Sequence, residues 1–234
     1  MDQLNVVGLV AAGIILLIGF PIHEFSHAWT ANRLGDATAR FMGRVSLDPR
    51  RHFDPTGGIL LLVSAGIAGI PLGWAKPTPV NPSNLQGGHR GEAVVAAAGP
   101  VSNLVMATAG AFVVRVIDAS GGGLQAVIAE SPALAWAFGV LVFFVWINVL
   151  LFCFNLIPIF PLDGWSVLKG FLSPLQTYRY RFQLAQIERY GPMILIGLIA
   201  LAFFIPGGGP ISIVLGGVAG GLFTLLTGRG SPLG

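Results

Sequence analysis

Two histidines spaced four residues apart, with a glutamate directly after the first, are the residues of this chain best suited to chemistry. The sequence there is His23-Glu24-Phe25-Ser26-His27. On a helix, positions i and i+4 share one face, so His23 and His27 can hold one metal ion together. Glu24 lies beside them but off that line, as a base acting on metal-bound water would. This HExxH spacing is a zinc pattern, and it predicts one Zn²⁺ per chain.

The metal motif ends a segment that has the character of a membrane span. Residues Val6 to Ile22 carry no charge, and about 20 apolar residues at a rise of about 1.5 Å each cross a bilayer. Ionisable side chains at membrane depth are costly and are therefore functional candidates. A chance cluster facing lipid headgroups is the plain alternative. With only four histidines in the chain, the spacing favours metal binding.

Composition predicts an all-α polytopic membrane protein of the cell membrane, with the lipid bilayer as a partner. Of the 234 residues, 54% are hydrophobic and 10% are charged, whereas soluble domains carry about 25% charged residues. The net charge of +3 is concentrated in loops, where it indicates topology and not a nucleic-acid partner. We expect a single domain over residues 1–234, with its core at 5–170 and C-terminal helices at 190–227.

Apolar segments and loop charges together predict about five to six transmembrane helices. After the first span, four segments are long enough or nearly long enough to cross: Ala93–Ile117, Ala133–Ile157, Gly191–Ile205 and Ile211–Leu226. Cytoplasmic loops are rich in Lys and Arg. Basic residues gather after the first span and between the second and third of these four segments, namely Arg33, Arg40, Arg44, Arg50, Arg51, Lys169, Arg179, Arg181 and Arg189. The metal motif therefore faces the cytoplasmic side.

Three further segments have irregular patterns. Gly58–Gly73 is apolar but rich in Gly, and the loop charges on both sides of it favour a re-entrant element over an ordinary short span. Arg44–Asp54 alternates polar and apolar residues around an Asp-Pro turn, which predicts a short membrane-associated β-hairpin. Gly73–Pro82 has too many prolines for a helix or a central strand, and it should be extended.

A catalytic zinc site usually has three protein ligands, and Asp163 is the candidate for the third. It follows the Ala133–Ile157 segment at its cytoplasmic end. Pro158 and Pro161 end that helix, and Gly164 permits a tight turn. The plain alternative is a turn aspartate with no metal role. The usual ligand count of catalytic zinc favours the ligand.

Four motifs, in order along residues 5 to 170, together resemble the site-2 protease family of intramembrane zinc metalloproteases, peptidase family M50. They are HExxH, the Gly73–Pro82 loop GWAKPTPVNP, Gly99-Pro100-Val101-Ser102-Asn103, and Asn155–Gly164 with the text NLIPIFPLDG. Members often carry a PDZ or CBS domain. We expect a compact bacterial-type member without either, because no stretch outside the apolar segments is long enough to hold one.

The resemblance implies an endopeptidase that hydrolyses peptide bonds in the transmembrane segments of single-span membrane proteins. It implies that His23, His27 and Asp163 bind zinc and that Glu24 is the catalytic base for attack by zinc-bound water. A membrane transporter or metal permease that uses the same cluster as an ion site is the alternative function. The chain shows no inverted repeat with paired broken helices, which argues against a transporter.

Substrate contacts are expected from three residues. The resemblance suggests that Asn155 and Asn103 hydrogen-bond the substrate chain or the reacting carbonyl, although packing between membrane helices explains buried asparagines equally well. Lys76 lies in the extended Gly73–Pro82 segment. An unwound substrate could add to the backbone edge of that segment as a strand.

Overall fold

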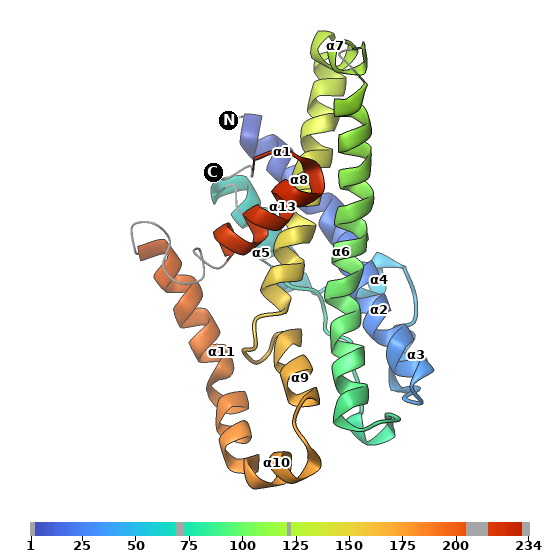
Figure 1. Ribbon diagram of the computed structural model, residues 1–234, viewed down its shortest axis with the longest axis vertical. Helices are drawn as coiled ribbons and strands as arrows, with labels where there is room; N and C mark the ends of the chain where they lie inside the picture. The colour runs from blue at the N-terminus through green and yellow to red at the C-terminus, as the bar shows by residue number, and fades with distance from the viewer. Residues whose placement is uncertain (1–2, 69–72, 121–122, 205–214, 231–234) are drawn as a thin grey trace.

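Figure 1 shows the computed structural model of the protein, which describes residues 3–68, 73–120, 123–204 and 215–230. The described residues are helical wherever their structure is regular, and they include no strand. This confirms the all-α class for that part of the chain. The division into one domain and the count of five to six spans stay predictions.

The first helical element carries the metal motif. It consists of α1 (Gln3–Ile14), the π-turn η1 (Ile15–Gly19) and α2 (Phe20–Arg33), which follow one another without a break. Pro21 explains the π-turn, because proline has no N–H and clashes with the carbonyl four residues earlier. The N–H of Phe20 reaches back five residues to the carbonyl of Ile15. The wider turn thus carries the chain past Pro21 and into the HExxH helix.

Two long helices form the centre of the molecule. α6 (His89–Ala119) and α8 (Pro132–Asn155) run side by side along its long axis, with the short α7 (Gly123–Glu130) at their tip (Figure 1). α6 also contacts α2 and α9 (Asp163–Gly170). Because α6 contacts both helices that carry predicted zinc ligands, it fixes their relative position.

The described part of the chain contains further, mostly shorter, elements. They are α3 (Thr38–Phe41), α4 (Pro49–His52), α5 (Pro55–Ala68), η2 (Pro82–Asn84), α10 (Pro174–Arg179), α11 (Arg181–Phe204), η3 (Leu215–Ala219) and α13 (Gly220–Thr227). The apolar core includes Ala12, Leu61, Ala107, Trp146 and Phe223. The ring centroids of Trp146 and Phe223 are 5.5 Å apart, and the rings lie edge to face, which is a favoured aromatic geometry.

Three helices in the described part of the chain are long and apolar enough to cross a membrane: His89–Ala119, Pro132–Asn155 and Arg181–Leu201. Two shorter apolar helices cover Pro55–Gly66 and Gly216–Thr227. The first overlaps the segment expected to be re-entrant, of which residues 69–72 lie outside the description. Residue 205 of the predicted Gly191–Ile205 span and residues 211–214 of the predicted last span also lie outside it.

The predicted β-hairpin at Arg44–Asp54 is wrong. This segment contains α4 and irregular backbone, with no strand. The carboxylate of Asp48 accepts a hydrogen bond from the N–H of Arg50, and Pro49 occupies the first helical position, so the Asp-Pro pair starts a helix instead of a hairpin turn. The carbonyls of Ser46 and Arg51 accept from side chains and not from a paired strand.

Residues Gly73–Pro82, which we term the strap, form an extended segment without helix or strand up to Asn81, as the prolines predict. The backbone N–H of Lys76 donates to the carbonyl of His52 at 2.8 Å. Near the other end, the N–H of Asn81 donates to the buried carboxylate of Asp36 at 2.7 Å. The strap is therefore tied at two points, and its middle crosses the HExxH helix.

Candidate metal centre

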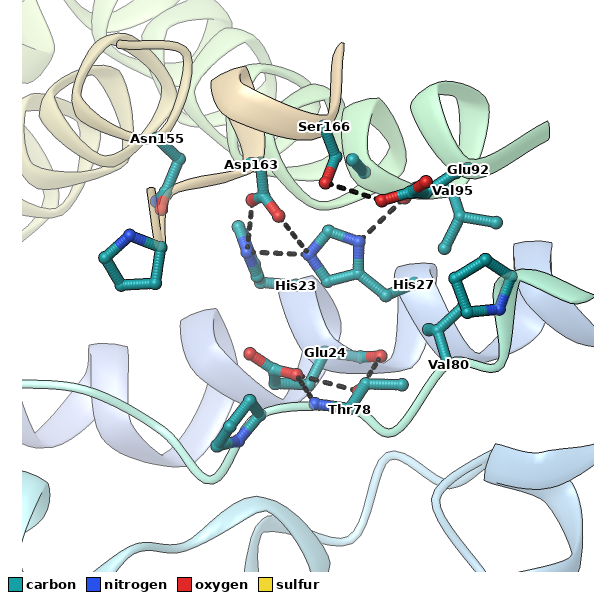
Figure 2. Close-up of a pocket in the computed structure, with 14 residues that line it drawn as sticks. His23, Glu24, His27, Thr78, Val80, Glu92, Val95, Asn155, Asp163 and Ser166 are labelled. Carbon is teal, nitrogen blue, oxygen red and sulfur yellow. Dashed lines mark hydrogen bonds and ion pairs between the residues drawn. The ribbon is translucent and has the colours of Figure 1, made fainter. Parts of the chain in front are cut away.

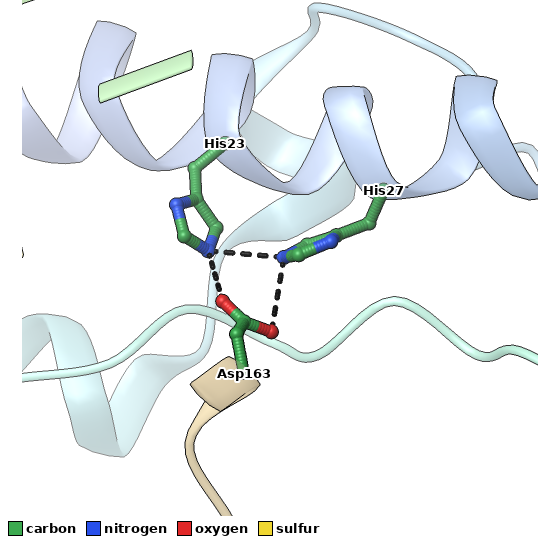
Figure 3. Close-up of side chains that lie close together, drawn as sticks. All are labelled: His23, His27 and Asp163. Atoms are coloured by element: carbon green, nitrogen blue, oxygen red, sulfur yellow. Dashed lines mark hydrogen bonds and ion pairs between the residues drawn. The ribbon is translucent and has the colours of Figure 1, made fainter. Parts of the chain in front are cut away.

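The three predicted zinc ligands lie together (Figure 3). The Nε2 atoms of His23 and His27 are 3.1 Å apart. The carboxylate of Asp163 reaches both rings, with Oδ2 3.3 Å from the Nε2 of His23 and Oδ1 3.4 Å from the Nε2 of His27. Both histidines are buried, at 9% and 7% exposure. α2 supplies the two rings, and the first residue of α9 supplies the carboxylate.

The donor set fits a zinc ion. The Nδ1 of His27 lies 2.7 Å from the carbonyl of Val95, and the Nδ1 of His23 lies 2.5 Å from the Oδ1 of Asn103. Since both partners accept, each Nδ1 carries the proton and each Nε2 presents a lone pair. Two lone pairs and a carboxylate then converge on one point. Two imidazoles and a carboxylate are a common ligand set of catalytic zinc.

Gly99 makes room for the ligands. A Cβ at this position would lie 2.3 Å from the Nε2 of His27 and 2.6 Å from the Nε2 of His23. Any side chain would thus occupy the space in which the two nitrogens meet. At Gly99 the backbone of α6 can therefore approach the predicted metal site directly.

A network of charged groups holds α9 against α6. The ammonium of Lys169 lies 3.1 Å from the Oε1 of Glu92, and the hydroxyl of Ser166 donates to the same oxygen at 3.0 Å. Lys169 also lies 3.0 Å from a carboxylate oxygen of Glu188. Although burial lowers the pKa of Lys169, the hydrogen bonds and charges of the two glutamates raise it above its ordinary value. Asp163 thus begins a helix that is fixed to the wall of the site.

Glu24 faces the strap. Its Oε2 accepts a hydrogen bond from the backbone N–H of Thr78 at 2.8 Å, and the Thr78 hydroxyl lies 2.7 Å from the same oxygen. Figure 2 shows Glu24 directed toward the strap, while Asp163 approaches the histidines from the opposite side of the view. The strap therefore fixes the side chain expected to act as the base.

Comparison with known proteins agrees with this geometry. The model of peptidase family M50 matches residues 11–198. The chain belongs to peptidase family M50. It is 36% identical over 185 residues to the protein named "Putative zinc metalloprotease YwhC" of Bacillus subtilis, covering 79% of this chain and 78% of that protein. No solved structure gives a significant match.

A second relative covers more of the chain. The protein named "Putative zinc metalloprotease Rip2" of Mycolicibacterium smegmatis is 29% identical over 209 residues, which are 85% of this chain and 69% of that protein. The M50 chain is accordingly a membrane zinc metalloprotease, and its apolar helices agree with that class. The family favours the hydrolase over the transporter alternative.

The sequence-predicted substrate residues lie in different places in this M50 protease. Asn155 lines a cavity of ≈ 320 Å³ together with the three metal-site residues, Glu24 and Thr78. Asn103 is fully buried against His23. The strap contains Lys76, whose side chain is exposed and is not part of the cavity lining. Their substrate roles stay predictions.

Two residues near the site were not predicted to have a role. Thr78 contacts Glu24, and Asn148 contacts Asn103 through a 3.0 Å hydrogen bond. Asn148 precedes Asn155 by seven residues, so the two share a helix face. A polar residue repeated on one face of an apolar helix is the signal that could have found it.

Proposed function

We propose that this M50 protease is an intramembrane endopeptidase that hydrolyses peptide bonds within the transmembrane segments of single-span membrane proteins. The observation that carries the proposal is the convergence of His23, His27 and Asp163 in a cavity that Glu24 also lines. α6 and α8, which are long and apolar enough to cross a membrane, both contribute to the lining of this cavity, and this supports a reacting bond that enters the bilayer. We place the protein in the cell membrane as a multi-pass protein, with its site toward the cytoplasm.

One zinc ion held by the two imidazoles and the carboxylate would polarise the scissile carbonyl and acidify water at the site. Glu24 takes the proton that the attacking water loses as its oxygen bonds to the carbonyl carbon. It then gives this proton to the nitrogen of the breaking C–N bond. The carboxylate of Glu24 accepts both of its hydrogen bonds from Thr78 at Oε2, so we assign the proton transfer to Oε1.

Asn155 is proposed to orient the substrate. Its Nδ2 donates one hydrogen bond to the carbonyl of Leu151 at 2.9 Å, which fixes the amide in the cavity wall. An amide nitrogen carries a second N–H. We assign this second N–H to the carbonyl oxygen of the bond being cleaved, where a preorganised donor stabilises developing negative charge.

The strap is proposed to bind the substrate backbone. A transmembrane helix hides its peptide bonds in its own hydrogen bonds, so it must unwind before it can be cleaved. The extended backbone between Lys76 and Pro82 borders the cavity through Pro77, Thr78 and Val80. An unwound substrate segment can add to such an edge as a strand.

The test is reconstitution of the full chain in liposomes with a panel of single-span proteins. We expect the wild type to cleave at least one of them, with the cut located in the apolar segment by mass spectrometry. Glu24→Gln should lower the cleavage rate by about 100-fold or more while zinc content is unchanged, because the amide cannot accept the proton. Glu130→Gln, at an exposed position of α7, is the matched control and should cleave at the wild-type rate.

Two results would contradict the proposal. Cleavage that persists in Glu24→Gln would show that Glu24 is not the catalytic base. Cleavage restricted to soluble unfolded peptides, with every membrane-embedded segment left intact by active enzyme, would remove the intramembrane substrate class.

A further inference from the structure

A chain of buried amides leads from α8 to the first zinc ligand. Asn148 donates through Nδ2 to the carbonyl of Phe144 at 2.9 Å, and its Oδ1 accepts from the Nδ2 of Asn103 at 3.0 Å. The Oδ1 of Asn103 lies 2.5 Å from the Nδ1 of His23. Both asparagines have no exposed surface. The chain contains three hydrogen bonds and joins α8, α6 and α2.

The direction of these hydrogen bonds is set at one end by the backbone. A carbonyl oxygen can only accept, so the group of Asn148 that faces Phe144 must be its NH₂. Its oxygen then faces Asn103, and that oxygen also only accepts. The NH₂ of Asn103 must therefore face Asn148, which leaves the oxygen of Asn103 for His23.

The last hydrogen bond determines the tautomer of His23. An oxygen acceptor beside Nδ1 places the imidazole proton on Nδ1 and the lone pair on Nε2. Only that tautomer can bind a metal through Nε2, the atom that faces His27 and Asp163. If Asn103 turned its amide end for end, its NH₂ would face Nδ1, and the proton would move to the metal-facing nitrogen.

We propose that Asn148 is a positioning residue of the metal centre, which acts through Asn103 to keep His23 in the tautomer that binds zinc. This goes beyond the proposed function, because it concerns the zinc affinity of the M50 site and holds whatever the substrate is. Outer partners of metal-bound histidines fix tautomer and orientation, and their loss typically weakens metal binding by about 10–100-fold. His27 needs no such residue, since its Nδ1 partner is the backbone carbonyl of Val95.

The test measures zinc affinity of the full chain by competition with a chelator. Asn148→Leu keeps the number and branching of the side-chain heavy atoms but has no acceptor for Asn103, and it should raise the zinc dissociation constant by about 10–100-fold. Asn148→Asp should stay close to the wild type, because a carboxyl group buried there is protonated and can donate to the Phe144 carbonyl while it accepts from Asn103. Asn155→Leu is the matched control, because it removes an equivalent bond to a carbonyl four residues earlier on the same helix; its zinc affinity should not change.

A second readout requires neither zinc nor substrate. With ¹⁵N-labelled histidine in the metal-free protein, the Nδ1–H of His23 should give a solvent-protected signal in the wild type and in Asn148→Asp. That signal should be lost in Asn148→Leu. Only four histidines contribute to the spectrum, so a His23→Gln variant assigns it. Asn148→Ala carries the same expectations if the leucine variant does not fold.

A double substitution separates positioning from packing. Asn103→Asp presents only oxygens to His23, so the tautomer no longer depends on Asn148. Asn148→Leu should then cause no further loss of zinc affinity in the Asn103→Asp background. The proposal is overturned if Asn148→Leu lowers thermal stability but leaves the zinc affinity and the His23 signal unchanged. Equal losses in Asn148→Leu and Asn148→Asp would overturn it as well.

Discussion

At the scale of single residues, the metal centre depends on what surrounds its ligands as much as on the ligands. The imidazoles of His23 and His27 are both fixed through Nδ1, one by an asparagine and one by a backbone carbonyl. Asp163 reaches both rings from a different helix. Gly99 leaves the space in which their nitrogens meet. Each feature removes freedom that zinc binding would otherwise have to restrict.

Gly99→Ala should weaken zinc binding by about 100-fold or more, because its methyl group would overlap the nitrogens of both histidines and displace them from the ion. Chelator competition on the purified protein measures the effect. Gly139→Ala on α8 is the control, since a Cβ there meets nothing within 4 Å. Wild-type zinc affinity in the Gly99 variant would show that α6 does not border the ion.

Some of the residues at this site could be predicted from the sequence, and others could not. The histidines and Glu24 follow from local spacing, and Asp163 follows from helix topology and ligand count. Thr78 and Asn148 could not be found in the same way, because each acts through a contact to a residue 54 or 45 positions away. The seven-residue spacing of Asn148 and Asn155 indicates a polar helix face, but it does not identify the partner of either side chain.

At the scale of elements, the strap is held by polar anchors and not by a sheet. Asp36 accepts from the N–H of Asn81 at one carboxylate oxygen and from Thr38 and Asn84 at the other. The guanidinium of buried Arg44 donates to the carbonyls of Arg51 and Lys76. The alternating pattern of residues 44–54 suggested strands, but the buried side chains of Arg44 and His52 occupy carbonyls of this segment that strand pairing would need.

The Asp36 anchor should make stability depend on pH. Burial raises its pKa, but hydrogen bonds from Thr38, Asn81 and Asn84 outweigh this and lower the pKa below its ordinary value of 3.8. A carboxyl group with a lowered folded-state pKa stabilises the fold above pH 3.8, and this contribution is lost as pH falls through the folded-state value. Asp36→Asn should therefore cost about 1–3 kcal/mol at pH 7 and progressively less below pH 3.8.

Thermal unfolding of the detergent-solubilised protein between pH 2.5 and pH 7, in steps of about half a unit, measures the Asp36 effect. Thr38→Val removes one hydroxyl donor to the same carboxylate and should give a smaller change of the same sign. If the difference in stability between Asp36→Asn and the wild type is constant with pH, the ionised carboxylate of Asp36 does not stabilise the fold.

At the scale of the whole molecule, α6 organises the protease. It contacts α2, α8 and α9, so the elements that carry the predicted ligands meet on one helix. The membrane class could be predicted because each apolar segment is a long, continuous run of residues in the sequence. Which helices cross completely depends on how short elements such as α5 pack, and hydropathy alone does not determine that.

Topology can be tested with single cysteines. Cys153 is the sole cysteine, so Cys153→Ala gives a clean background for replacements at Arg51, Lys76 and Glu130, which are all exposed. A membrane-impermeant maleimide should label the first two from the cytoplasmic side and the third from the outside. If Lys76 were labelled from the same side as Glu130, the segment that includes α5 would cross the membrane and would not be re-entrant.

X-ray absorption at the zinc edge of the purified full chain, together with its zinc content, tests whether His23, His27 and Asp163 bind zinc. We expect one zinc per chain in the wild type, with two imidazole nitrogens and carboxylate oxygen at about 2.0–2.2 Å. Asp163→Ala should lose the carboxylate oxygen and most of the zinc, whereas Glu24→Gln should leave the spectrum unchanged. An unaltered first coordination shell in Asp163→Ala would show that Asp163 is not a zinc ligand.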